Sequence, residues 1–181
     1  MRHLVYLRPG TVVLIDELAA RNPSTYELWF HADGQPGRTP DRLFRSVAER
    51  AWESATPTGR CRITALNPAD AVAEAGTQPI IGTGGHPGFD LEVLRLRNAR
   101  PVRSALFVTV VDVWAGAQDR PLPELRTQGG RLRLKVHVGR KVWTCRVSPG
   151  QRDPAHPILR DIRWSTTAPR AGKRACRNHD S

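Results

Sequence analysis

The sequence of 181 residues lacks the features that define several large classes of protein. Hydrophobic residues make up 39% of it, and no run approaches the roughly 18 apolar residues that a membrane span requires. The longest uncharged aliphatic run, Val12–Ile15, has only the length of part of a strand. The stretch MRHLVYLRPG has too short an apolar part for a secretory leader, and no small-residue cleavage site follows it. We therefore expect neither a membrane protein nor an export signal in this chain.

Lysine is also scarce. It occurs only as Lys135, Lys141 and Lys173, so 25 of the 28 basic residues are arginine. Seventeen acidic residues oppose them, and the formal net charge is +11. Such an excess indicates a polyanionic partner, or it reflects a GC-rich coding bias without functional meaning. The basic residues are spread along the chain and form no block of like charge, so the total charge alone does not decide between the two.

Metal-ligating patterns are missing as well. There is no CxxC and no HxH, and the six histidines are far apart in the sequence. Zinc sites draw on ligand pairs at close spacing, so we expect no metal and no other cofactor. The three cysteines are Cys61, Cys145 and Cys176. Cys61 and Cys145 form either a disulfide or, as we expect, two buried free thiols.

The segments that are present have the pattern of strands. Runs rich in β-branched and aromatic residues alternate with Gly/Pro turns, and no regular series of helices separates them. The predicted strands are Thr11–Leu18, Tyr26–Ala32, Arg60–Leu66, Leu91–Arg97, Ala105–Trp114, Arg131–Val138, Lys141–Val147 and Ile158–Trp164. The short connection Arg21–Ser24 predicts antiparallel pairing of the first two. We expect an all-β fold, an antiparallel β-sandwich over residues 1–167, and a disordered basic tail over residues 168–181.

One segment fits two structures. In Thr39–Ser54 the apolar side chains recur at helical spacing, and Thr39 and Pro40 suit the start of a helix. An amphipathic helix therefore competes with strands over this stretch.

The clearest local pattern is a hairpin centred on Gly139-Arg140. Leu132, Leu134, Val136 and Val138 alternate with Arg131, Arg133, Lys135 and His137. A two-residue type II′ turn with glycine first would pair residue 138 with residue 141. This register places Arg133 opposite Arg146 on the outer face, so the hairpin should carry a basic ladder of Arg131, Arg133, Lys135, His137 and Arg146. The ladder is a candidate substrate-binding surface. Three alternatives could face this ladder: a polyanionic ligand, acidic residues of another domain, or solvent, if the charges only protect an edge strand from pairing.

Part of the chain resembles a known family. The stretch RHLVYLRPGTVVLIDELAARNPSTYELWFH, from Arg2 to His31, resembles the C-terminal β-domain of heparinase II/III-like polysaccharide lyases. The segments ITALNPAD and RSALFVTVV resemble later strands of that domain. The resemblance covers residues 2–165 in patches, and it begins close to Met1. It implies a β-sandwich that is incomplete at its N-terminus and normally follows an α/α toroid.

The resemblance implies β-elimination of acidic, uronate-containing polysaccharides, with a base and an acid acting at the uronate. The family's Tyr, His and Asn or Glu catalytic residues and its metal ligands belong to motifs that are absent here, so no catalytic residue can be assigned. Asp16 and His31 match two polar positions of the family pattern. We expect structural roles for both, with Asp16 capping a turn and His31 hydrogen-bonded within the sandwich. Full-length relatives of this kind are expected to be periplasmic or secreted.

Three functions remain open. The first is the non-catalytic β-portion of such a lyase, working with an upstream toroid, and the second is a stand-alone module that binds acidic glycans. The third is a nucleic-acid-binding β-protein, which requires exposed aromatic residues among the basic ones. We expect most of the tryptophans at positions 29, 52, 114, 143 and 164 to pack in the core, and Trp143 to face inward. Nucleic acid is therefore the least favoured partner.

Overall fold

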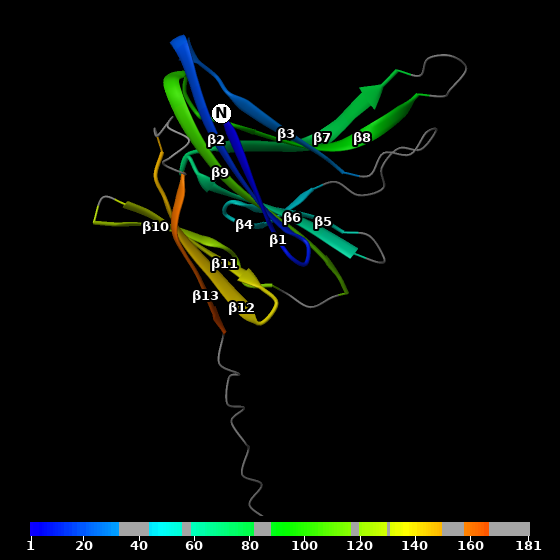
Figure 1. The fold of residues 1–181 in the computed structure, drawn as a ribbon. Helices are drawn as coiled ribbons and strands as arrows, with labels where there is room; N and C mark the ends of the chain where they lie inside the picture. The colour runs from blue at the N-terminus through cyan, green and yellow to red at the C-terminus, as the bar shows by residue number, and fades with distance from the viewer. Residues whose placement is uncertain are drawn as a thin grey trace, which may run out of the picture.

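A computed structural model describes residues 1–32, 44–55, 59–81, 88–116, 120–129, 131–149 and 158–166. Within these residues every regular element is a β-strand and every strand pairing is antiparallel (Figure 1). The predicted all-β antiparallel fold is therefore confirmed. The strands form three sheets.

The largest sheet has six strands in the order β1-β2-β9-β6-β5-β4 and is called the central sheet below. Its strands are β1 (Arg2–Leu7), β2 (Thr11–Ser24), β4 (Arg45–Ala48), β5 (Ala51–Ala55), β6 (Gly59–Asn67) and β9 (Val102–Ala115). The three-stranded sheet, in the order β3-β8-β7, consists of β3 (Glu27–Ala32), β7 (Val72–Ile80) and β8 (Phe89–Arg97). The four-stranded sheet follows chain order, with β10 (Glu124–Gln128), β11 (Arg131–Val138), β12 (Lys141–Val147) and β13 (Leu159–Thr166).

The central sheet separates two hydrophobic cores. One core joins it to the four-stranded sheet and includes Val13, Ile15, Val110, Leu134 and Trp143. The other joins it to the three-stranded sheet and includes Ile63, Phe107, Leu28, Leu94 and Leu96. Consecutive residues 107 to 110 of β9 are therefore fully buried, because both faces of this strand are covered. The sandwich has three layers, and the outer faces of the two smaller sheets point away from each other (Figure 1).

A buried polar cluster ties the central sheet to the segment after β9. The Thr11 hydroxyl donates to the Asp112 carboxylate at 2.6 Å, and the Arg62 guanidinium lies 3.5 Å from the same carboxylate. The side chains of Arg62 and Asp112 are almost fully buried. The Arg62 guanidinium also lies 5.1 Å from the centre of the Trp114 ring and donates to the Arg120 carbonyl at 2.8 Å. Removal of the carboxylate would leave a buried cation without its counter-charge.

The pairing predicted for the first two strands is wrong. The segment 11–18 belongs to β2, which continues to Ser24 and pairs with β1 and β9. The segment 26–32 is β3, which pairs with β8 in another sheet. The register of β2 against β9 shifts between Ala19 and Ser24, so the stretch that suggested a turn is an irregular end of a long strand.

The helical alternative is wrong for residues 44–54, which form β4, a turn and β5; residues 39–43 of this stretch lie outside the described residues. Phe44 and Ala51 are buried whereas Val47 is 53% exposed, so the apolar positions do not share one buried helical face. Pairing of β5 with β6 supplies backbone hydrogen bonds that outweigh the local helical spacing. The tail predicted at 168–181 also lies outside the described residues.

Candidate anion-binding face

The hairpin of β11 and β12 has the predicted register. Val138 pairs with Lys141, Lys135 with Thr144, and Arg133 with Arg146. Gly139 has a φ of +60°, which the first position of the two-residue turn requires. The alternating apolar residues of β11 are packed against the central sheet, so the alternating basic residues lie on the outer face of the four-stranded sheet.

The neighbouring strands extend the basic residues of the hairpin into a row across the sheet. Arg126 of β10 lies opposite Arg133, and Arg160 of β13 lies opposite Arg146. Directly paired residues point to the same face, so Arg126, Arg133, Arg146 and Arg160 form one row, called the arginine row below. Neighbouring strands are about 4.8 Å apart, so the row crosses the sheet with one arginine at each strand step.

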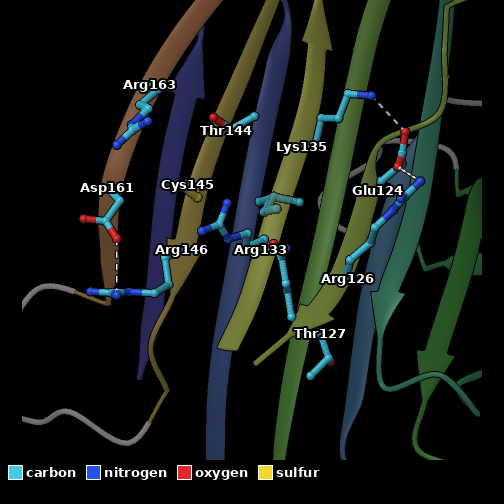
Figure 2. A pocket seen from close by; sticks show the side chains of 12 residues that line it. Glu124, Arg126, Thr127, Arg133, Lys135, Thr144, Cys145, Arg146, Asp161 and Arg163 are labelled. Atoms are coloured by element: carbon cyan, nitrogen blue, oxygen red, sulfur yellow. Dashed lines mark hydrogen bonds and ion pairs between the residues drawn. The ribbon is translucent and has the colours of Figure 1, made fainter. Parts of the chain in front are cut away.

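A second row lies beside the arginine row. It consists of Glu124, Lys135, Thr144 and Arg163, again one residue from each strand. Side chains of the two rows, with the exception of Arg160, line an open hollow of about 620 Å³ on the outer face (Figure 2). Five cationic side chains and two carboxylates line the hollow, which gives a formal surplus of three positive charges. The cations are Arg126, Arg133, Lys135, Arg146 and Arg163, and the carboxylates are Glu124 and Asp161.

The two carboxylates engage only some of the cations. The Glu124 carboxylate lies 3.1 Å from the Lys135 ammonium and 2.5 Å from the Arg126 guanidinium. The hydrogen bond from Lys135 lowers the pKa of Glu124, which keeps this carboxyl ionised. Asp161 lies 3.2 Å from the Arg146 guanidinium. Figure 2 shows these three contacts at the two sides of the hollow.

Two further arginines line the hollow without such contacts. Arg133 and Arg163 make no ion pair or hydrogen bond with a described residue. Arg133 lies between Arg126 and Arg146, so a like charge opposes it on each side. A guanidinium offers five donors in a fixed plane and binds carboxylate, sulfate or phosphate oxygens in pairs. The arrangement is therefore suited to a ligand with several anionic groups.

The structure brings together part of the predicted ladder. Arg133, Lys135 and Arg146 line the hollow, whereas Arg131 and His137 lie on the same face outside it. Burial, followed by the charge of Lys135, lowers the pKa of His137, which favours the neutral imidazole. The predicted ladder therefore shares Arg133, Lys135 and Arg146 with the hollow, whose lining cations come from all four strands of the sheet.

Sequence reasoning missed Arg126, Arg160 and Arg163. Arg126 lies on β10, whose sequence ELRTQ is too short to be recognised as a strand from its pattern. The dipeptide Gly129-Gly130 between β10 and β11 is nevertheless a sequence signal for a two-residue turn. Arg160 and Arg163 share the outer face because the register of β12 and β13 shifts between Thr144 and Arg146. No local pattern predicts such an irregularity.

The two polar positions of the family pattern lie far from this hollow, on other sheets. Asp16 does not cap a turn: it is buried within β2 and accepts two hydrogen bonds from the Arg2 guanidinium, at 2.6 and 3.2 Å. His31, near the end of β3, lies 3.1 Å from the side-chain oxygen of Gln78. Both side chains are engaged in contacts within the fold.

The tryptophans divide between core and surface. Trp143 and Trp114 are buried, as expected, and Trp143 faces inward. Trp52 is half-buried and packs against the core beside the three-stranded sheet, so most tryptophans do contribute to the interior, whereas Trp29 and Trp164 are 45% and 50% exposed. Neither lines the hollow.

Cys61 and Cys145 are free thiols, as expected, but only Cys145 is fully buried and Cys61 is half-buried. Burial raises the pKa of Cys61 to about 11 and that of Cys145 to about 12. In the described part of the chain, no group of three or more His, Cys, Asp or Glu side chains is placed to hold a metal ion. No helix long and apolar enough to cross a membrane is found there either.

Comparison with known proteins gives no relative. No protein-family model, curated protein or solved structure matches the chain.

Proposed function

We propose that the chain is a non-catalytic binding module for acidic polysaccharides, which it holds on the outer face of the four-stranded sheet. The observation that carries the proposal is the arginine row, in which like charges face each other across adjacent strands. Such pairs cost stability, by about 0.2–1 kcal/mol each. A bound polyanion converts this repulsion into attraction, because its charges lie between the guanidinium groups.

The lining of the hollow favours a glycan over nucleic acid. No aromatic side chain is among the twelve lining residues. Proteins that hold single-stranded nucleic acids combine a basic groove with aromatic rings on which bases stack. Carboxylate or sulfate groups on a polysaccharide need only the paired donors that arginine provides.

A second candidate is the β-portion of a heparinase II/III-like polysaccharide lyase that works with an upstream α/α toroid. The observation that favours it is the pattern from Arg2 to His31, which occupies β1, β2 and β3. In this setting too, the chain alone is expected to be inactive, since none of the family's catalytic motifs is present. We expect no rise in unsaturated-uronate absorbance when the purified chain is incubated with heparin, alginate or polygalacturonate.

Retention on a heparin column tests the binding proposal. The variant carrying Arg133→Gln and Arg163→Gln removes the two lining cations that have no described partner. Arg103→Gln is the matched control, because Arg103 is an exposed arginine on the central sheet with no described side-chain partner. The double variant should elute at a clearly lower salt concentration than wild type. The elution salt of the control should fall by no more than the loss of one positive charge explains. Equal shifts per charge removed would mean that retention depends on net charge and not on this face.

A further inference from the structure

The outer face of the three-stranded sheet, on the opposite side of the molecule from the arginine row, carries an exposed aromatic group. Trp29 on β3 is 45% exposed, whereas the adjacent Leu28 is buried in the core. Glu27 and His31 flank Trp29 on the same outward face, since side chains two residues apart share a face of a strand. This indole is therefore presented to solvent by a sheet whose other side is firmly packed.

Contacts hold the indole in place. Its Nε1 donates to the Glu27 carboxylate at 3.0 Å, and the Arg95 guanidinium lies 5.5 Å from the ring centre. The His31 ring is 6.4 Å away and within 18° of parallel to the indole. His31 in turn lies 3.1 Å from the Gln78 side-chain oxygen. A ring fixed in this way loses little conformational entropy when a ligand binds to it.

Space is available beside the rings. Gly76 of β7 lies in register with Val93, which itself lies opposite His31. A Cβ atom added to Gly76 would meet no atom within 4 Å. Gly76 therefore leaves an open area above β7, next to Gln78 and separated from His31 by the buried Val93.

The charges of this area are balanced, unlike those of the hollow. Arg95 forms ion pairs with Glu74 and with Glu27, the latter at 3.6 Å, and Arg97 lies 3.5 Å from Glu74. The hydrogen bond from Arg95 lowers the pKa of Glu74, so this carboxylate stays ionised. A polyanion would meet no net positive charge here, because Arg95 and Arg97 balance the carboxylates of Glu27 and Glu74. Each carboxylate nevertheless keeps lone pairs with which it can accept hydrogen bonds from hydroxyl groups.

We propose that Trp29, His31 and the neighbouring Glu27, Glu74 and Gln78 form a binding platform for an uncharged pyranose ring of a polysaccharide. The C–H groups on one face of a pyranose carry partial positive charge and would pack on the exposed part of the indole, beside Arg95. The sugar hydroxyls at the ring edge are donors for the carboxylates and partners for the Gln78 amide. This site is independent of the arginine row and does not require acidic groups on the ligand.

Calorimetric titration with cellohexaose, xylohexaose and mannohexaose tests the platform. At least one of these uncharged hexasaccharides should bind, and Trp29→Ala should weaken that binding by about tenfold or more, as truncation of an aromatic anchor does at other interfaces. Trp164→Ala is the matched control, since Trp164 is 50% exposed on a different sheet. It should leave the affinity unchanged.

A blocking variant separates loss of the platform from loss of the fold. Gly76 does not have a left-handed conformation, so Gly76→Leu should fold normally and place its side chain over the open area. It should abolish hexasaccharide binding while the thermal transition stays in place. The proposal is overturned if no uncharged hexasaccharide binds, if Trp164→Ala weakens binding as much as Trp29→Ala, or if oligo(dT) binds instead in a Trp29-dependent manner. Retention on heparin should be unaffected by Trp29→Ala, so failure here leaves the function proposed for the hollow standing.

Discussion

Replacement of Arg133 should make the protein more stable and a weaker binder at the same time. Arg133 is opposed by Arg126 on one side and Arg146 on the other and has no described partner of opposite charge. Arg133→Gln keeps the length and polarity of the side chain but removes both repulsions. A residue retained only for packing would show the opposite behaviour, because its loss would destabilise the fold.

The size of the gain follows from the exposure of the two neighbours. A directly opposed like-charge pair costs about 0.2–1 kcal/mol. The Arg126 side chain is 78% exposed, so that pair lies at the low end, whereas the Arg146 side chain is 21% exposed. The Asp161 carboxylate partly offsets the charge of Arg146. We therefore expect a gain of about 0.5–1 kcal/mol at low ionic strength, which raises the melting temperature by about 1–4 °C in a chain of this size.

Thermal unfolding followed by circular dichroism at 20 mM and at 1 M NaCl measures this gain. The gain should largely vanish at 1 M salt, because the Debye length falls to about 3 Å. Arg103→Gln, which relieves no cross-strand pair, should change the melting temperature little at either salt concentration. A lower melting temperature for Arg133→Gln, or a gain that is the same at both salt concentrations, would refute the electrostatic reasoning.

Three further changes test the fold that positions the site. Asp112→Asn should lower the free energy of unfolding, measured in urea, by about 3 kcal/mol, because the buried Arg62 loses its counter-charge. Asp161→Asn, at the surface, should lower it by less than about 1 kcal/mol. Gly10→Ala should destabilise the fold by at least about 1 kcal/mol more than Gly139→Ala. Both glycines have a positive φ, but a Cβ atom at Gly10 would also lie 2.2 Å from the backbone oxygen of Val113, whereas one at Gly139 would meet no atom within 4 Å. Cys145, with its pKa raised to about 12, should resist iodoacetamide in the native protein at pH 8 and react once guanidinium unfolds it, as located by peptide mass spectrometry. Because burial raises this thiol's pKa, its contribution to stability is complete below pH 9 and should be lost as the pH rises toward 12.

The sequence predicts those parts of the site whose geometry depends on residues close together in the chain. The register of β11 and β12 depends on a two-residue turn and on strict alternation, so the sequence alone predicts that Arg133 pairs with Arg146. The contribution of β13 depends on a register shift opposite Thr144 and Arg146, and only the three-dimensional packing determines that shift. This is why the predicted ladder runs along one strand and the observed arginine row runs across four.

The errors in the fold have the same origin. The segment 44–54 has helical spacing, but its residues form β4 and β5 because β6 offers a strand edge to pair with. The pairing predicted for the first two strands is wrong because a short connection does not always join partners in one sheet. In the structure the chain passes from the central sheet to the three-stranded sheet between Ser24 and Glu27. Which sheet a strand joins is decided by contacts distant in sequence, and single-strand patterns do not contain that information.

The hollow beside the arginine row is proposed to hold an acidic polysaccharide. Nitrogen-15 NMR of the arginine Nε–H groups, recorded as a heparin-derived hexasaccharide is added, tests it at the level of single residues. We expect the signals of Arg133 and Arg163 to shift first and furthest, those of Arg126 and Arg146 to follow, and the signal of Arg103 to stay in place. If no arginine signal moves, or if the signal of Arg103 moves as much as that of Arg133, the acidic polysaccharide does not bind at this hollow.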